Sequence, residues 1–253
     1  MRRLLLLPVI SLSLSASVIS DTNFIEKVFQ DVLNRPANPG EVSTYLTYLG
    51  TPGDTRQGMA LQILTTTEYR TDLVASYYQA YLHRPTDSGA AILVTALGGG
   101  ATDEQVQSMI VGSPEYFGDH GSDNTQFIDG VYLDLLNRPA SPGDVSLGMI
   151  FLGGNTRGQF AGFLLSTTEY DNLLVNTYFA AYLNRPPDST EHSFYVPELQ
   201  SSISNEVVQS QIIGTSEFYN AAQSVPEPAS SFQLGIGTVL MWLGIRRRLL
   251  RRA

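Results

Sequence analysis

The sequence predicts an all-α protein in which tandem helical repeats lie between two apolar terminal segments. Three observations lead to this prediction. The middle of the chain matches itself at a separation of roughly 100 residues, apolar side chains in each copy recur at helical spacing, and arginines accompany the apolar segments at both ends. The 253 residues therefore divide into the ranges 1–20, 21–120, 121–224 and 225–253.

Residues 1–20 have the pattern of a secretory signal peptide. Arg2 and Arg3 form a positively charged start, Leu4–Leu14 form an apolar segment too short to span a bilayer, and small residues follow it. Such a leader is removed during export through the Sec translocation machinery. We therefore expect the folded protein to begin near Asp21.

The middle of the chain contains two copies of a two-part unit. Residues 24–69 match residues 127–170, and residues 73–117 match residues 174–219. Each of these stretches has an apolar segment that ends in Asn-Arg-Pro or His-Arg-Pro, and each ends in Ser/Thr-x-Glu-Tyr/Phe. The predicted order is four modules, A-B-A-B, grouped as helical repeat pair 1 (21–120) and helical repeat pair 2 (121–224), with the junction between the pairs at 113–126.

Each module is predicted to contain several helices. In residues 24–33 apolar side chains recur at i, i+1, i+4 and i+5, which places a broad apolar stripe on one helical face, and the other three modules repeat this spacing. A proline after each arginine ends the helix. Glycines at 50, 98–100 and 153–154 are expected to end the second helices. The expected N-cap residues of the second helices are Asn38, Asp87, Ser141 and Asp188, and Thr65–Glu68, Thr102–Gln105 and Ser166–Glu169 predict further capping boxes.

The most regular polar feature is an arginine at the end of the first helix of each module and a glutamate near the start of its last helix. The two are separated by 31–33 residues in every module. This near-constant spacing predicts structural ion pairs or helix-dipole partners rather than a ligand site. The residues are Arg35, Arg84, Arg138 and Arg185, with Glu68, Glu115, Glu169 and Glu217.

The tyrosines of the first helices leave two alternatives open. Tyr77, Tyr78 and Tyr81 could form a platform on which sugars stack, because aromatic faces suit that task. Their helical spacing favours packing in the core instead. Tyr45 and Tyr48 raise the same question.

Residues 225–253 predict a membrane-spanning tail. Pro226-Glu227-Pro228 interrupts regular structure, because proline fixes φ and lacks an N–H donor. The 17 residues Ala229–Ile245 carry no charge and would be about 26 Å long as a helix, which is slightly short of the hydrocarbon core. The basic cluster Arg246, Arg247 and Arg248 should stay on the cytoplasmic side, so residues 21–224 should lie outside.

The Pro-Glu-Pro element, the short apolar helix and the arginine cluster occur in this order at the end of a chain that has a leader. This tail resembles the PEP-CTERM sorting signal. The resemblance implies cleavage by an exosortase-type membrane transpeptidase, transient anchoring in the inner membrane, and delivery to the cell surface or extracellular matrix. It also implies a Gram-negative bacterium and an association with exopolysaccharide and biofilm.

The repeats resemble a second family. Arg84-Pro85-Thr86-Asp87, Arg185-Pro186-Pro187-Asp188 and the four Ser/Thr-x-Glu-Tyr/Phe motifs are similar to the bacterial repeat called domain of unknown function 4214. The resemblance implies a helical repeat of secreted and surface proteins and carries no established activity. The Tyr-Trp that often follows the turn in that family is missing, and the only tryptophan is Trp242 in the tail.

Composition and motifs exclude several classes of function. Residues 21–224 carry 23 acidic and eight basic side chains, so their surface should repel nucleic acid. The chain has no cysteine, and its three histidines (His83, His120 and His192) have no metal-ligand spacing. No nucleophile turn, phosphate-binding loop or calcium loop is present. The sequence therefore predicts no metal site, no cofactor and no catalytic residues.

Two hypotheses about function remain. The first is an exported, non-enzymatic structural or interaction protein of the cell surface or exopolysaccharide. The alternative is a polysaccharide-binding or polysaccharide-acting enzyme delivered to the extracellular matrix. An enzyme would need carboxylates at unique positions. Most acidic residues here recur in register across the modules, which favours the first hypothesis.

Overall fold

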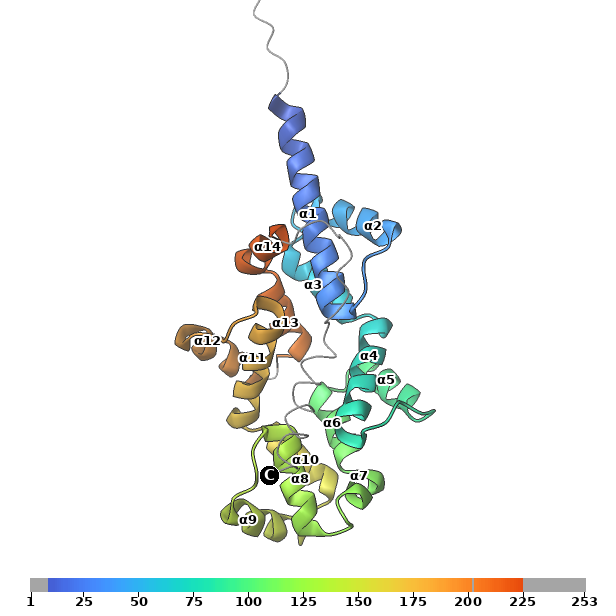
Figure 1. Cartoon of the computed structure of the whole chain (residues 1–253), viewed down its shortest axis with the longest axis vertical. Helices are drawn as coiled ribbons and strands as arrows, with labels where there is room; N and C mark the ends of the chain where they lie inside the picture. The colour runs from blue at the N-terminus through green and yellow to red at the C-terminus, as the bar shows by residue number, and fades with distance from the viewer. Residues whose placement is uncertain (1–8, 202, 225–253) are drawn as a thin grey trace, which may run out of the picture.

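A computed structural model describes residues 9–201 and 203–224, and all of the regular structure in these residues is helical (Figure 1). The all-α prediction is confirmed. The predicted tail, with its Pro226-Glu227-Pro228 element, lies outside the described residues. The helices are α1 (Val9–Leu33), α2 (Pro39–Leu49), α3 (Arg56–Leu64), α4 (Thr67–Tyr77), the π-helix η1 (Tyr78–Leu82), α5 (Ala90–Gly98), α6 (Asp103–Val111), α7 (Pro114–Asp119), α8 (Asn124–Leu136), α9 (Pro142–Leu152), α10 (Arg157–Leu165), α11 (Thr168–Leu183), α12 (Ser189–Gln200), α13 (Asn205–Ile213) and α14 (Ser216–Gln223).

Helix α1 is longer than the first helix that the repeat pattern predicts. It begins at Val9 and runs through Ser20, where the leader was expected to end, to Leu33. Between Pro8 and Pro36 the sequence has neither proline nor glycine, so nothing interrupts the helix. Cleavage near residue 20 would leave Asp21 at the new helix N-terminus, where a carboxylate is favourable.

Four of the seven predicted caps start their helices where expected. Asn38, Ser141 and Asp188 each accept a hydrogen bond from the N3 backbone N–H, and the side chain of the N3 acid accepts one from the backbone N–H of the cap residue. Thr102 forms the same box with Gln105 at the start of α6. These reciprocal bonds fix where the second and third helices begin.

Three of the predicted caps are wrong in detail. Helix α5 has Gly89 as its N-cap, and Asp87 instead accepts the Gly89 N–H at 2.8 Å. Helices α4 and α11 are capped by Thr66 and Thr167, one residue after the predicted cap positions. This shift puts Glu68 and Glu169 one position too early in the helix to close a capping box, so their carboxylates are available to other partners.

The residue before each arginine has a feature that the sequence analysis missed. Asn34, His83, Asn137 and Asn184 adopt left-handed backbone conformations with φ between 53° and 55°. Asparagine tolerates this region better than most residues, and a left-handed residue after the last helical one is a common helix end. The turn lifts the chain out of the helix and directs the following arginine back along it.

The predicted modules are joined by continuous helical structure at the boundaries between the first and second and between the third and fourth, but not between the second and third. Helix α11 contains both the Ser/Thr-x-Glu-Tyr motif of the third module and the first helix of the fourth, and α4 with η1 does the same for the first and second modules. Between the second and third modules, by contrast, α7 ends at Asp119 and α8 begins at Asn124, within the predicted junction.

The hydrophobic core divides into two clusters that do not follow the sequence pairs. One cluster combines buried residues of α1 and α3 with those of α11–α14, and the other combines those of α4–α7 with those of α8 and α10. Leu73 and Leu174 pack against both clusters. The predicted first module therefore packs on the predicted fourth, and the second on the third, so the predicted boundary between residues 120 and 121 divides elements that share one core.

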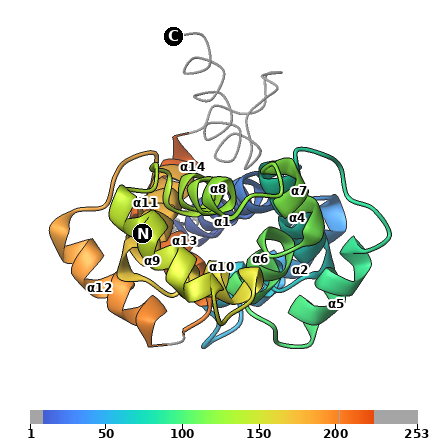
Figure 2. The same cartoon turned by 90° about the horizontal axis from the view of Figure 1, so that it is seen from below.

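The part of α1 near residues 20–24 packs against α14, the last described helix. In α14, Phe218 meets Phe24 of α1 with ring centroids 5.8 Å apart and perpendicular planes. Gln223 Nε2 donates to the backbone oxygen of Ser20 at 3.1 Å, and the Tyr219 hydroxyl donates to Asp21 Oδ1 at 3.2 Å. The result is a closed arrangement in which α5 and α12 project from opposite sides (Figure 2).

The junction between α7 and α8 is packed rather than a free linker. The His120 ring lies 4.2 Å from the ring of Tyr116 and leaves no room for a side chain at Gly130. His120 therefore packs between α7 and α8 at this junction. Gly112 of the α6 end likewise lets α6 approach α10, since a Cβ there would come within 2.5 Å of the Gly158 backbone.

Candidate functional site

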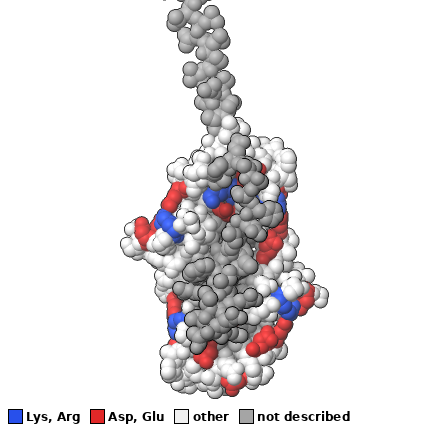
Figure 3. All heavy atoms as spheres, in the orientation of Figure 1, with Lys and Arg blue, Asp and Glu red and all other residues white. Residues whose placement is uncertain are grey.

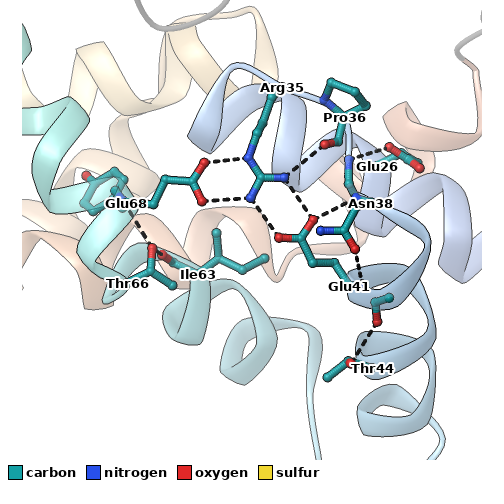
Figure 4. Close-up of polar contacts among 12 residues, drawn as sticks. Glu26, Arg35, Pro36, Asn38, Glu41, Thr44, Ile63, Thr66 and Glu68 are labelled. Atoms are coloured by element: carbon teal, nitrogen blue, oxygen red, sulfur yellow. Dashed lines mark hydrogen bonds and ion pairs between the residues drawn. The ribbon is translucent and has the colours of Figure 1, made fainter.

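The eight repeated arginines and glutamates come together as four pairs, one in each module. Figure 4 shows the first, in which Arg35 lies between two carboxylates. Its Nε and Nη2 donate to the two oxygens of Glu68 at 2.5 and 2.8 Å, and its Nη1 and Nη2 donate to Glu41 at 2.9 and 2.8 Å. Nη1 also donates to the Pro36 carbonyl at 3.1 Å. All five guanidinium N–H groups are thus used. We call each such group an arginine clasp.

The other three clasps repeat this geometry. Each arginine holds the glutamate of the last helix through Nε and Nη2, donates to the following proline carbonyl through Nη1, and meets an acid at the start of the second helix. The distances from Nη2 to the glutamates are 2.7, 3.1 and 2.6 Å for Arg84–Glu115, Arg138–Glu169 and Arg185–Glu217. The second acid accepts from Nη2 of Arg84 at 2.9 Å (Asp87) and from Nη1 of Arg138 and Arg185 at 2.8 Å each (Asp144 and Glu191).

An aromatic ring lies beneath each guanidinium. The ring belongs to the residue six positions before the arginine, on the helix that the arginine ends. The distances from the guanidinium carbon to the ring centroid are 5.1 Å for Arg35–Phe29, 5.0 Å for Arg84–Tyr78, 4.8 Å for Arg138–Tyr132 and 5.1 Å for Arg185–Phe179. This placement is within the range of favourable cation–π contact.

The clasps lie at the surface, where water weakens their electrostatics. The side chains of the four arginines are 31–37% exposed and those of their glutamates 43–48%. Hydrogen bonds from the arginine lower the pKa of Glu68, Glu115 and Glu217, and the Arg138 bond lowers the pKa of Asp144 to about 2. Blue side chains lie beside red ones on the face in Figure 3.

This arrangement can join three helices but leaves little for a ligand. The arginine follows the first helix, the second acid lies at or just before the start of the second helix, and the glutamate belongs to the last, so one side chain joins all three. The sequence predicted the arginine and glutamate as partners. It missed the second acids, Glu41, Asp87, Asp144 and Glu191, although their places at or just before the start of the second helix were a signal that they lie beside the turn after the arginine.

The clasp in the third module gives a direct test of this structural role. We expect Arg138→Ala to lower the free energy of unfolding by about 1–2 kcal/mol, because it removes an aromatic contact as well as two half-exposed ion pairs. Glu169→Ala should cost about 0.5–1 kcal/mol. Thermal melts of the two single variants and the double variant should give a coupling energy of about 0.5–1 kcal/mol.

The control is a double-mutant cycle between Arg138 and the exposed Asp54. In this cycle the changes in unfolding free energy of the two single variants should add up to that of the double variant within about 0.3–0.5 kcal/mol. A coupling near zero for Arg138 and Glu169 would show that the clasp does not hold the module together.

A second polar group lies between the two hydrophobic clusters, and it too has equivalent members in the two halves. Gln107 Oε1 accepts from the hydroxyls of Tyr81 and Tyr170 at 2.6 and 3.1 Å, and Gln209 Oε1 accepts from Tyr182 and Tyr69 at 2.6 and 3.3 Å. All of these side chains are buried. They link the first half of the chain to the second.

The tyrosines therefore decide between the two alternatives left open by the sequence. Tyr77, Tyr78 and Tyr81 are each 7% exposed and belong to the core, so they cannot form a sugar-stacking platform. Tyr45 packs against Phe29 with centroids 5.8 Å apart. The spacing argument for core packing is confirmed.

Asp103 lies at the centre of this polar group. It is 5% exposed, and its Oδ2 accepts from Asn205 Nδ2 at 3.2 Å, while its Oδ1 has no partner in the described structure. Asn205 occupies the equivalent position in the other half and also donates to Glu104 at 2.7 Å. Burial, together with the nearby Glu206 and Glu104, raises the pKa of Asp103 to about 8.

The histidines and acids show no constellation beyond these. Among the described residues, no three His, Asp or Glu side chains are placed to hold a metal ion. In the same part of the chain no helix is long and apolar enough to cross a membrane.

Comparisons with models of protein families, with curated proteins and with solved structures give no match for this chain.

Proposed function

We propose that this protein is an exported, non-enzymatic structural or interaction protein of the cell surface or exopolysaccharide, processed by an exosortase-type system. In this proposal residues 21–224 form four modules in the order A-B-A-B, and residues 225–253 form a transmembrane sorting tail. The partners are the Sec translocation machinery during export and the exosortase-type transpeptidase afterwards. The folded part is then presented outside the cell.

The observation that carries the proposal is that the two ends of the folded part meet. The end of the leader and the start of the tail are bridged by Gln223, which bonds to the Ser20 carbonyl at 3.1 Å. Figure 1 shows α1 and α14 at the same end of the molecule. Whether the leader or the tail holds the protein at the membrane, the same side of the folded part would face the membrane and the same far side would be presented. Removal of the leader would therefore not require the folded part to turn.

The clasps support a structural role over catalysis. A catalytic acid must be free to exchange protons or contact a substrate. The glutamate of the last helix in each clasp instead accepts two hydrogen bonds from its arginine, as Glu217 does from Arg185 at 2.6 Å through both contacts. The same group occurs four times, which suits a scaffold built from repeated modules.

The sorting step can be tested in cells. We expect deletion of residues 235–253 to release the protein into the medium or periplasm, because the apolar segment that would retain it is lost. Replacing Pro226, Glu227 and Pro228 with alanine should leave an unprocessed form in the membrane fraction. Fractionation followed by mass spectrometry of the C-terminus measures both results.

The control is Asn220→Ala, an exposed change in α14 that should be sorted and cleaved as the unaltered protein is. An intact C-terminus on the mature, unaltered protein would rule out cleavage. Retention of the deletion variant in the membrane would rule out anchoring by the tail.

A further inference from the structure

Three of the eight basic residues between positions 21 and 224 form no ion pair with a described residue. Lys27 pairs with Asp31, and four arginines are in the clasps. Arg56, Arg70 and Arg157 remain. An unpaired cation is unexpected where acidic residues outnumber basic ones almost three to one.

Arg56 and Arg157 occupy equivalent positions in the two halves, and each lines a cavity. The cavity at α3 measures about 450 Å³ and includes Thr55 and Arg56. The cavity at α10 measures about 320 Å³ and includes Thr156 and Arg157. In both, the threonine caps the helix and the arginine follows it. Both cavities are also lined by a leucine of the second helix and by a glycine. These are Leu49 and Gly214 in the first cavity and Leu152 and Gly112 in the second.

The two cavities differ in charge at two equivalent positions. The α3 cavity is lined by Asp21 and Asp54, whereas the α10 cavity has Asn124 and Asn155 in their places. One arginine and two aspartates give the α3 cavity a formal charge of −1. One arginine and two asparagines give the α10 cavity a formal charge of +1. Only the second should attract an anion.

Arg157 is held in a fixed position at this cavity. Its guanidinium carbon lies 3.3 Å from the ring centroid of Phe117, and Nη2 donates to Asn124 Oδ1 at 3.3 Å. Its Nε is buried and has no hydrogen-bond partner in the described structure. The arginine is therefore oriented in advance by stacking, while part of its hydrogen-bonding capacity is unused.

We propose that the α10 cavity, lined by Arg157, Asn124, Asn155 and Thr156, binds a ligand through a single carboxylate group. A planar carboxylate matches the guanidinium fork, and asparagine side chains can bond to neighbouring hydroxyl groups. One positive charge balances one negative charge. A dianion such as sulfate would leave an uncompensated charge in a protein that is already strongly acidic. A sugar acid or a small organic acid supplies this chemistry.

The test uses the full chain in detergent and four probes, which are sodium glucuronate, sodium acetate, sodium sulfate and glucose, at constant ionic strength. We expect glucuronate to bind at one site with a Kd on the order of millimolar, as befits a single charged contact. Glucose should not bind measurably, and sulfate should bind more weakly than glucuronate. Saturation-transfer NMR and titration calorimetry measure binding. If acetate matches glucuronate, the carboxylate alone is recognised; if glucuronate binds more tightly, the sugar hydroxyls contribute.

Variants make the test specific to the cavity. Arg157→Gln should weaken glucuronate binding at least about tenfold, and Asn155→Asp, an exposed change that keeps the fold, should do the same by adding the charge found at Asp54. Arg70→Gln, which alters an unpaired arginine outside both cavities, should leave binding unchanged. The double variant Asp21→Asn with Asp54→Asn should create a second site, because it gives the α3 cavity the charge of the α10 cavity.

Three results would overturn the proposal. They are binding of glucose as tight as that of glucuronate, binding that survives both Arg157→Gln and Asn155→Asp, and binding of sulfate that is tighter than that of either carboxylate. The proposal does not depend on processing of the tail, so failure of the sorting experiments leaves it intact.

Discussion

Phe218→Ala should lower the free energy of unfolding by about 3–5 kcal/mol, although the residue lies in the last described helix. A terminal helix in an open stack contacts a neighbour on one side only, so a truncation there costs less. In this protein Phe218 is fully buried, and its ring meets Phe24 at 5.8 Å and Tyr182 at 6.4 Å. The variant would leave a cavity in the cluster that joins the two ends of the chain.

Chemical denaturation monitored by circular dichroism measures this effect. Asn220→Ala, an exposed change on the same helix, is the matched control and should stay within about 0.5 kcal/mol of the unaltered protein. A double-mutant cycle with Phe24→Ala should show coupling, because the rings touch. A loss below about 1 kcal/mol for Phe218→Ala, or additivity with Phe24→Ala, would contradict the closed arrangement.

Asp103→Asn should stabilise the protein by a few kcal/mol at pH 8 and by little at pH 4. Burial raises the pKa of Asp103 from its ordinary value of 3.8 to about 8 in the folded state. Between these values the folded state keeps a proton that the unfolded state has released, so stability falls as the pH rises from about 4 to about 8. Each unit of displacement is worth about 1.4 kcal/mol. Asparagine cannot ionise and does not incur this cost.

Thermal melts of both proteins across pH 4–9 would show the difference growing with pH and then becoming constant. The groups that face Asp103 are Glu104 on its own helix, Asn205 and Glu206 on α13 and Tyr77 on α4. The control is Asn220→Ala, an exposed change that removes no titratable group, and it should give a difference that does not change with pH. An Asp103→Asn difference that is equally flat would show that Asp103 is not held in its neutral form.

The contribution of the clasps to stability has the opposite pH dependence from that of Asp103, because it decreases as the pH falls. Their arginines lower the pKa of Glu68, Glu115 and Glu217, so these carboxylates stabilise the fold above their ordinary pKa of 4.5. That contribution is lost as the pH falls through the lowered values. With the Asp103 cost increasing above pH 4, the protein should be most stable in mildly acidic solution.

Much of the local structure was predictable from the sequence because its signals act over a few residues. The apolar spacing from Phe24 to Leu33 predicted a buried helical face, and Asn38 and Ser141 predicted helix starts, since a cap needs only the three residues that follow it. The partnership of Arg138 with Glu169 was predictable for a different reason. The same spacing recurs in four modules, so a single geometry had to satisfy all of them.

What the sequence could not determine was which modules share a core. The apolar faces of the four first helices are nearly alike in pattern, so each could pack on the module before it, after it or at the far end of the chain. Only the tertiary structure places Phe218 on Phe24 and brings Asp103 beside Asn205. Hydrophobic burial has no direction and depends little on sequence separation, so the choice depends on how the whole chain closes. Local bonds decided where each helix begins and ends, and the shape of the complete molecule decided what each helix touches.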